Sequence, residues 1–443
     1  MTNRRRFVVT VAIAVLAMVS AIGVAQWSDA SAGQTVMAEP RESSETVARG
    51  AYLAKLGDCE ACHTVPGRPA FSGGLRMTIP IGAIYTTNIT PDLQYGIGRL
   101  SLADFDRALR FGVSGGHTLY PAMPFTSYAN TRPEDVEALY AYFMYSVAPA
   151  AVPNQPNDVP FPLSLRWPLT YWRLLFAPRP RPFVATASVD AAVARGQYFV
   201  DGLGHCGECH TPRALTLQLK ARTASDGAAY LSGAAIEGYF APNLRSGGKE
   251  TLTAWSVDDL AEFLRTGTNA HASVFGSMTD VVSHSTQHMS SADARDTARY
   301  LKSIVDPTSP QGRFSYDQST DAGLRVGADQ ARGARIYLDN CASCHRPDGK
   351  GYDRAFPPLA GNPVVLAPNP DSVISVVLKG AQTPRTESTP AQFAMPSFGW
   401  RLSDDQIADV TTFVRSSWGN GAGAIDAREV SLLRPPTMRQ ASN

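Results

Sequence analysis

Apolar side chains recur at helical spacing in three stretches of the chain. In residues 132–147, 291–304 and 404–417 they return every three or four positions. This spacing places them on one face of an α-helix, so each stretch is predicted to form an amphipathic helix that buries that face. The alternating apolar and polar pattern that strands produce is nearly absent. We therefore expect a mostly α protein.

Polar residues with helix-capping spacing support these helices. A Ser or Thr side chain accepts a hydrogen bond from the backbone three residues on, and an acid or amide at that position bonds back. Pairs with this spacing precede two of the three stretches and two further predicted helices. They are Thr131 with Glu134, Ser403 with Gln406, Ser101 with Asp104 and Ser256 with Asp259.

The same order of features occurs three times, which indicates an internal repeat. Each unit opens with an Ala-Arg-Gly triplet that ends at Gly50, Gly196 or Gly333, continues with a Cys-x-x-Cys-His motif and closes with one of the predicted helices. A chain of 443 residues is expected to form about three domains, which agrees with three units. We predict helical domains at 44–148, 186–305 and 328–420, a connector rich in proline and aromatic residues at 149–185, a linker at 306–327 and a polar tail at 421–443.

Residues 1–33 have the composition of an export signal. Three arginines at 4–6 precede an apolar run from residue 7 to about 25, and small and polar residues follow. Cleavage after Ala25 and cleavage after Ala32 both fit. The alternative is an uncleaved N-terminal anchor, because about 20 apolar residues suffice to span a bilayer. In either case the body of the protein lies outside the cytoplasm.

All six cysteines belong to the Cys-x-x-Cys-His motifs. The motifs are Cys59, Cys62 and His63; Cys206, Cys209 and His210; and Cys341, Cys344 and His345. Disulfides would leave the histidines unexplained, and a structural zinc site needs four ligands at matched spacing. On a helix, positions i, i+3 and i+4 share a face, so both thiols can reach a porphyrin edge while the histidine ligates the iron. The motifs therefore predict three covalently bound haem c groups.

The sixth iron ligand separates electron transfer from small-molecule chemistry. The third unit has no histidine besides His345, so a second histidine cannot fill that position. Met395 lies 50 residues after His345 and precedes Pro396, which favours an extended backbone that can project the side chain. Met438, in the polar tail, is the other methionine of this unit. Met395 is the predicted ligand.

Methionines take corresponding positions in the other two units. Met123 lies 60 residues after His63 and precedes a proline, and Met278 lies 68 residues after His210 without one. Alternatives stay open in both units. They are Met77, Met144 and His117 for the first unit, and Met289, His271, His284 and His288 for the second.

Longer motifs carry a resemblance to a known family. They include GAIYTTNITPDLQYGIG at 82–98, GLGHCGECHTPR at 202–213 and MPSFGWRLSDDQIADVTTFVRSSW at 395–418. With them the chain resembles the three-haem cytochrome c subunit of bacterial membrane-bound dehydrogenases, the group that serves alcohol, gluconate and sorbitol oxidation. The resemblance implies three tandem class I cytochrome c-like domains after the export signal. It also implies the cysteines as haem attachments, the motif histidines as proximal ligands and Met123, Met278 and Met395 as distal ligands.

The resemblance also implies a function and a location. A dehydrogenase catalytic subunit, a flavoprotein or quinoprotein with or without a small third subunit, would supply electrons. Membrane quinone or a terminal oxidase would accept them, and the exported, membrane-associated chain would lie on the periplasmic side of the bacterial cytoplasmic membrane. No nucleophile and base set stands out in the sequence, so we expect no catalysis by the chain alone.

Other classes of function fit the sequence less well. The formal charge of +1, from 40 basic and 39 acidic residues, argues against a nucleic-acid partner. An electron-transfer subunit of a molybdenum hydroxylase is an alternative that keeps the carrier role and changes the partner. A haem peroxidase is a further alternative, and it would need an open or displaceable position on one iron.

Overall fold

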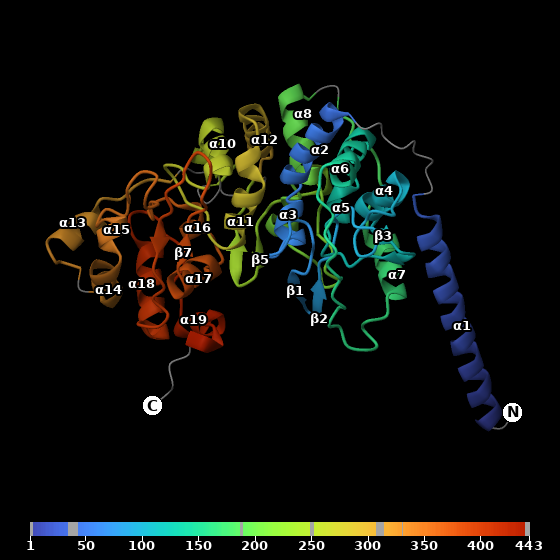
Figure 1. Cartoon of the computed structure of the whole chain (residues 1–443). Coiled ribbons are helices and arrows are strands. Elements are labelled where there is room, and N and C mark those ends of the chain that lie inside the picture. The colour runs from blue at the N-terminus through green and yellow to red at the C-terminus, as the bar shows by residue number, and fades with distance from the viewer. Residues whose placement is uncertain are drawn as a thin grey trace. The chain divides into compact units, whose positions relative to one another are not determined.

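The computed structural model describes residues 3–33, 43–186, 189–248, 252–306, 314–329 and 331–438. Helices dominate these residues, as predicted (Figure 1). The chain divides into two compact bodies, called unit 1 (residues 1–184) and unit 2 (residues 185–443) from here on, and the three repeating segments of the sequence are called repeats. The boundary between the units falls at the end of the predicted connector. The division into three domains at the predicted bounds stays a prediction.

Unit 1 contains a long N-terminal helix and a helical domain with two small antiparallel ribbons. Its helices are α1 (Asn3–Ser31), α2 (Ser44–Leu56), α3 (Cys59–His63), α4 (Leu102–Phe111), α5 (Phe125–Tyr128), α6 (Pro133–Tyr145) and α7 (Trp167–Phe176). Its ribbons pair β1 (Arg76–Ile79) with β2 (Gly82–Tyr85), and β3 (Val113–Ser114) with β4 (His117–Thr118). Helix α7 lies in the connector and packs against α1.

Unit 2 contains the second and third repeats. Its helices are α8 (Ala191–Tyr198), which continues into a π-helical turn (Phe199–Leu203), α9 (Gly207–His210), α10 (Val257–Thr266), α11 (Ser277–His284), α12 (Ser291–Ser303), α13 (Ser319–Arg325), α14 (Arg332–Asn340), α15 (Ala342–His345), α16 (Pro363–Leu366), α17 (Asp371–Lys379), α18 (Asp404–Ser416) and α19 (Ala427–Leu433). Its ribbons pair β5 (Ala234–Ile236) with β6 (Tyr239–Ala241), and β7 (Ala381–Gln382) with β8 (Ala394–Met395). The strands of both units are two to four residues long, too short for an alternating pattern to predict them.

The first and last helices of each repeat cross at a glycine. The pairs are α2 with α6, α8 with α12 and α14 with α18. A Cβ atom on the glycine would lie 1.8 Å from the Ala138 carbonyl oxygen at Gly50, 2.0 Å from that of Asp296 at Gly196 and 2.3 Å from that of Asp409 at Gly333. These distances are shorter than any van der Waals contact, so the backbones can approach this closely only without a side chain. The repeated Ala-Arg-Gly triplet is thus explained by the helix crossing.

The arginine before each glycine forms an ion pair across the same crossing. Arg49 pairs with Asp135, Arg195 Nε lies 2.7 Å from Asp296 Oδ2, and Arg332 Nε lies 3.0 Å from Asp409 Oδ2. The arginine side chains are half exposed or more, so each pair contributes little net stability. Its recurrence in all three crossings supports the internal repeat.

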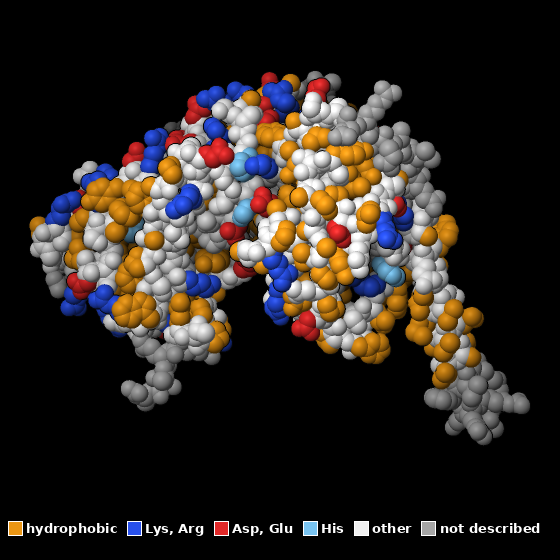
Figure 2. All heavy atoms as spheres, in the orientation of Figure 1, with side chains coloured by type: hydrophobic (Ala, Val, Ile, Leu, Met, Phe, Trp, Pro, Cys, Tyr) orange, Lys and Arg blue, Asp and Glu red, His pale blue; other side chains and the backbone are white. Residues whose placement is uncertain are grey.

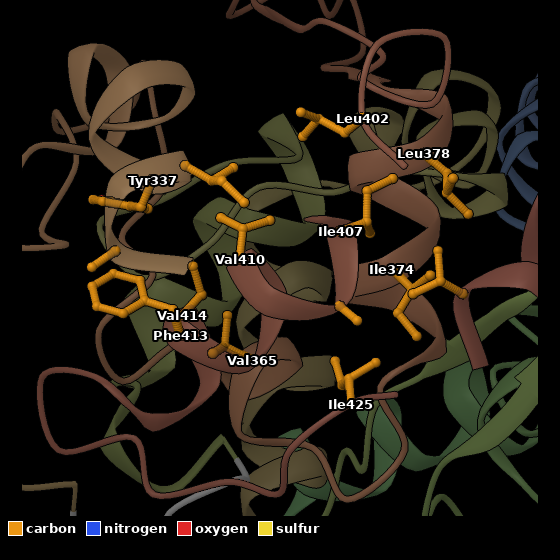
Figure 3. Close-up of a cluster of buried hydrophobic side chains, with 14 of the residues drawn as sticks. Tyr337, Val365, Ile374, Leu378, Leu402, Ile407, Val410, Phe413, Val414 and Ile425 are labelled. Atoms are coloured by element: carbon orange, nitrogen blue, oxygen red, sulfur yellow. The ribbon is translucent and has the colours of Figure 1, made fainter. Parts of the chain in front are cut away.

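The third repeat has a well-defined apolar core that includes part of the predicted tail. Figure 3 shows Tyr337 of α14, Ile374 of α17 and Val410 of α18 in one cluster of buried side chains. Val430 of α19 belongs to the same cluster. Arg434 donates from Nε to Asp404 Oδ1 at 2.7 Å and thereby fixes the end of α19 to the start of α18. Residues 427–434 are therefore part of the folded unit, although the sequence analysis assigned them to a polar tail.

Most predicted helix starts agree with the structure. The capping boxes at Ser101, Ser256 and Ser403 are present at the starts of α4, α10 and α18. The box predicted at Thr131 is wrong. Arg132 is the N-cap residue of α6, because Pro133 with its fixed φ occupies the first helical position and moves the start by one residue.

We expect Gly333→Ala to lower the free energy of unfolding of the haem-loaded protein by about 2–3 kcal/mol, because α14 and α18 must move apart to admit the methyl group. Gly423→Ala is the matched control, since a Cβ at Gly423 meets nothing within 4 Å. Denaturant titrations of both variants measure the difference. Equal unfolding midpoints would show that the close approach is not what requires glycine.

Candidate haem sites

Each Cys-x-x-Cys-His motif forms a single helical turn. In the first repeat the motif is α3 itself, and in the other two Cys206 and Cys341 are the N-cap residues of α9 and α15. The His210 amide donates to the Cys206 carbonyl at 3.0 Å, and the His345 amide to that of Cys341 at 2.9 Å. These bonds have i to i+4 spacing. The turn therefore brings the thiols and the imidazole to one face, as the spacing predicts.

A backbone carbonyl holds each motif histidine from behind. The Nδ1 atoms of His63, His210 and His345 lie 2.6, 2.8 and 2.9 Å from carbonyl oxygens. The acceptors are Thr87, Pro242 and Pro357. An Nδ1–H that donates to a carbonyl leaves Nε2 with its lone pair, which is the form that ligates a metal.

Burial keeps the histidines neutral. Desolvation lowers the pKa of each motif histidine, against the bond to the carbonyl, which raises it. Burial also raises the pKa of the Cys59, Cys206 and Cys341 thiols to about 12. Neutral, half-buried thiols beside an imidazole with a free Nε2 fit the requirements of haem c, in which the sulfurs become thioethers and the imidazole ligates iron.

The sequence analysis missed the three carbonyl acceptors, although a weak signal exists. Each acceptor is followed two residues later by Ile89, Leu244 or Leu359. In the first two repeats the residue between is an asparagine whose Oδ1 accepts from the backbone two residues on, at 2.9 Å from Thr90 N and at 2.8 Å from Arg245 N. Such Asx turns fix the backbone that directly follows the acceptor residue.

The disulfide and zinc interpretations find no support. All six cysteines are free. Within the residues that the structure describes, no group of three or more His, Cys, Asp or Glu side chains could hold a metal ion. Both findings agree with one haem for each motif.

The predicted distal methionines lie half-buried at the edges of short elements. Met123 stands in a turn before α5, and its amide donates to the Tyr120 carbonyl at 3.1 Å. Met278 is the second residue of α11, and Met395 is in β8 opposite Ala381. None of the three is packed into a core, so each side chain can serve as a ligand. The assignment of the sixth ligand itself stays a prediction.

Several rival ligands are engaged elsewhere. Met289 is a fully buried core side chain. His271 stacks on Trp255 with ring centroids 5.3 Å apart, and its Nε2 lies 3.4 Å from Asp259 Oδ2. The sulfur of Met438 lies 3.0 Å from where a Cβ on Gly399 would be, so it packs against that glycine. These contacts favour Met278 over Met289 and His271, and Met395 over Met438. Met77, Met144, His117, His284 and His288 lie in β1, α6, β4, α11 and a 3₁₀ turn at 286–288, respectively.

The second site carries a buried carboxylate that the sequence analysis did not predict. Asp201 lies in the π-helical turn and accepts from Tyr300 Oη at 2.9 Å, from Gln197 Nε2 at 3.1 Å and from Tyr230 Oη. It is only 6% exposed. Burial raises the pKa of the Asp201 carboxyl to about 6, against the three hydrogen bonds, which lower it. A proton is therefore held more tightly in the folded chain than in the unfolded one.

Short helices around three Cys-x-x-Cys-His turns, each with its imidazole held by a carbonyl, define a c-type cytochrome. A model of the cytochrome c family matches residues 330–418.

Relatives along nearly the whole chain identify the family. A gluconate 2-dehydrogenase cytochrome c subunit from Pantoea cypripedii is 49% identical over 410 residues, which cover 91% of this chain and 93% of that protein. The cytochrome c subunit of a quinone alcohol dehydrogenase from Gluconobacter oxydans is 48% identical over 393 residues, covering 88% and 82%. A fructose dehydrogenase cytochrome subunit from Gluconobacter japonicus is 37% identical over 431 residues, covering 91% and 87%. The chain belongs to this family of dehydrogenase cytochrome c subunits, as the sequence motifs indicated.

The pKa of Asp201 predicts a pH dependence that one substitution removes. The folded pKa is about 6 and the unfolded pKa about 4, so the contribution of Asp201 to stability is fully present below pH 4 and is lost as the pH rises through 6. The free energy of unfolding of Asp201→Asn minus that of the unchanged protein should therefore rise by roughly 2–3 kcal/mol when the pH is raised from 4 to 7.

Denaturant titrations of the haem-loaded proteins at both pH values measure this gain. Asp280→Asn, at an exposed position of α11 in the same unit, is the control and should follow the unchanged protein at both pH values. Parallel profiles for all three proteins would contradict a raised pKa at Asp201.

Proposed function

We propose that the chain carries electrons from a dehydrogenase catalytic subunit through three c-type haems to membrane quinone or a terminal oxidase. The observation that carries the proposal is the threefold Cys-x-x-Cys-His turn with a carbonyl behind each histidine. Relatives that are cytochrome subunits of gluconate, alcohol and fructose dehydrogenases support the carrier role. The partner would be a flavoprotein or quinoprotein, with or without a small third subunit, on the periplasmic side of the membrane.

The residues have distinct roles in this proposal. Two thioethers from each motif would attach one haem, through Cys59 and Cys62, Cys206 and Cys209, and Cys341 and Cys344. His63, His210 and His345 would be the proximal ligands, and Met123, Met278 and Met395 the distal ligands. The haem supplies one-electron redox chemistry. Methionine ligation would raise the haem potential and would fill the sixth position of the iron, which disfavours a peroxidase.

Contacts within unit 2 support electron passage between the second and third sites. Thr279, next to Met278, donates from Oγ1 to the Gln382 carbonyl at 3.5 Å. Gln382 belongs to β7, whose residue Ala381 pairs with Met395 in β8. The two segments that carry the predicted distal ligands are therefore neighbours. The second and third repeats are also joined by two hydrogen bonds. The Phe240 amide of β6 donates to Ser372 Oγ of α17 at 2.8 Å, and Ser372 Oγ donates to the Phe240 carbonyl at 2.9 Å.

We expect Met395→Ala to lower the midpoint potential of one haem by on the order of 0.1 V, because the iron loses a thioether ligand that favours the reduced state. The near-infrared band of sulfur-ligated ferric haem should weaken, while a pyridine haemochrome assay should still give three haems per chain. Met438→Ala is the control, since its sulfur packs against Gly399. A redox titration of Met395→Ala that matches this control would assign the sixth position to another residue.

Reconstitution tests the function as a whole. Adding the haem-loaded chain to the dehydrogenase encoded beside its gene should reduce all of its haem when that enzyme's substrate is supplied, and a quinone analogue should reoxidise it. A chain with Cys341→Ala and Cys344→Ala should accept about a third fewer electrons. Turnover of peroxide or of an alcohol by the isolated chain at enzymic rates would contradict the carrier role.

A further inference from the structure

The connector of unit 1 exposes a cluster of large apolar side chains. Phe161 is 80% exposed and Leu175 is 74% exposed, and Leu163, Leu165 and Leu174 are also exposed. We call these five residues the apolar face of the connector. Soluble surfaces rarely present so many large apolar side chains within one short segment, and such a patch marks an interaction site. Figure 2 shows apolar side chains along this edge of unit 1 and along α1.

The segment that carries the apolar face contains only basic residues among its charged side chains. Between Asp158 and Asp190 the sequence has no acidic residue and four arginines, at 166, 173, 179 and 181. Arg173 is buried against Asp29, at 3.1 Å, and Arg166 lies over the Tyr120 ring, at 4.2 Å from its centroid. Arg179 and Arg181 are exposed. Apolar side chains flanked by exposed arginines and by Trp167 and Trp172 have the composition of an element that lies in the surface of an anionic bilayer.

Helix α1 packs directly against the helix of the connector. Among the described helices, α1 alone is long and apolar enough to cross a membrane. Tyr171 Oη of α7 donates to the Ala21 carbonyl at 2.8 Å, within the apolar run of α1. Thr170 Oγ1 donates to Asp29 Oδ2 at 2.8 Å, which fixes the end of α1 to α7. Figure 1 shows that α1 and the loop that leads into α7 extend to the same side of unit 1.

We propose that residues 161–175 are a membrane-docking element that inserts its apolar face into the surface of an anionic lipid bilayer. Helix α7 would lie along the interface, with Leu174 and Leu175 among the acyl chains and with Arg179 and Arg181 at the lipid phosphates. This attachment acts through the folded connector, which the bonds of Thr170 and Tyr171 hold beside α1. It holds the haem domain of unit 1 at the membrane surface, where a quinone is accessible.

Site-specific photo-crosslinking tests the proposal on the full haem-loaded chain. Phe161 and Leu175 are replaced one at a time by p-benzoylphenylalanine, and the protein is illuminated with vesicles of phosphatidylcholine and phosphatidylglycerol. We expect phospholipid adducts at both positions, at least about tenfold above those at Leu215, a fully exposed leucine of unit 2. Because the adduct forms at the substituted position, it reports contact of that position with lipid.

Placing negative charges in the apolar face distinguishes docking on a bilayer from docking on a protein partner. Leu174→Glu with Leu175→Glu should reduce the lipid adducts at position 161 by about tenfold, whereas Leu215→Glu should not change them. Vesicles of phosphatidylcholine alone should give fewer adducts than the anionic vesicles. Absence of lipid adducts at both positions, or adducts with the dehydrogenase subunit alone in membranes that contain the complex, would overturn the proposal.

Discussion

The close contact between the first and last helices of each repeat is the constraint on which the haem sites depend. At Gly50, Gly196 and Gly333 the backbones meet without an intervening side chain, so neither helix can slide along the other without creating a clash. The Cys-x-x-Cys-His turn begins eight to ten residues after this glycine in every repeat. The crossing therefore fixes where the thiols and the imidazole emerge. The Arg and Asp pair beside it adds orientation at a small net energy, because the arginine side chains remain in solvent.

A second constraint is the backbone carbonyl that accepts from Nδ1 of each motif histidine. The three repeats position this carbonyl by different local features. In the first repeat the Asn88 amide, in the same peptide as the Thr87 carbonyl, donates to Asn154 Oδ1 at 2.7 Å, and in the second an Asx turn at Asn243 follows the Pro242 acceptor. In the third repeat the acceptor is Pro357, followed by Pro358, and the two fixed φ angles replace the side-chain bond. The common requirement is the position of one carbonyl oxygen. Because a backbone atom meets it, the residue type at that position is free to vary.

The distance in sequence between contacting residues explains what could be predicted from the sequence. Helix periodicity, three of the capping boxes and the motif turns depend on residues within four positions of one another, and the structure agrees with them. Even there, Pro133 overrode the pattern at Thr131, since its ring sets the helix start. The carbonyl acceptors lie 12 to 32 residues from their histidines, and Asp201 meets Tyr300 from 99 residues away. Contacts between residues so far apart produce no periodic pattern in the sequence. Helix α19 was missed because the contacts that anchor it, of Val430 with the apolar core and of Arg434 with Asp404, join residues distant in the sequence.

The π-helical turn follows from the same crossing. The first repeat has nine residues from the crossing glycine to the first cysteine, and the second has ten. Both ends of this segment are fixed, at one end by the contact of Gly196 with Asp296 and at the other by the bond from His210 to Pro242. The extra residue must be absorbed between them, and a kink within Phe199–Leu203 absorbs it at Gly202, whose φ of −118° and ψ of −113° are not helical. The third repeat has eight residues, so α14 ends at Asn340 and Cys341 caps the next turn directly. The spacing varies because the two fixed ends, and not the helix between them, define the haem site.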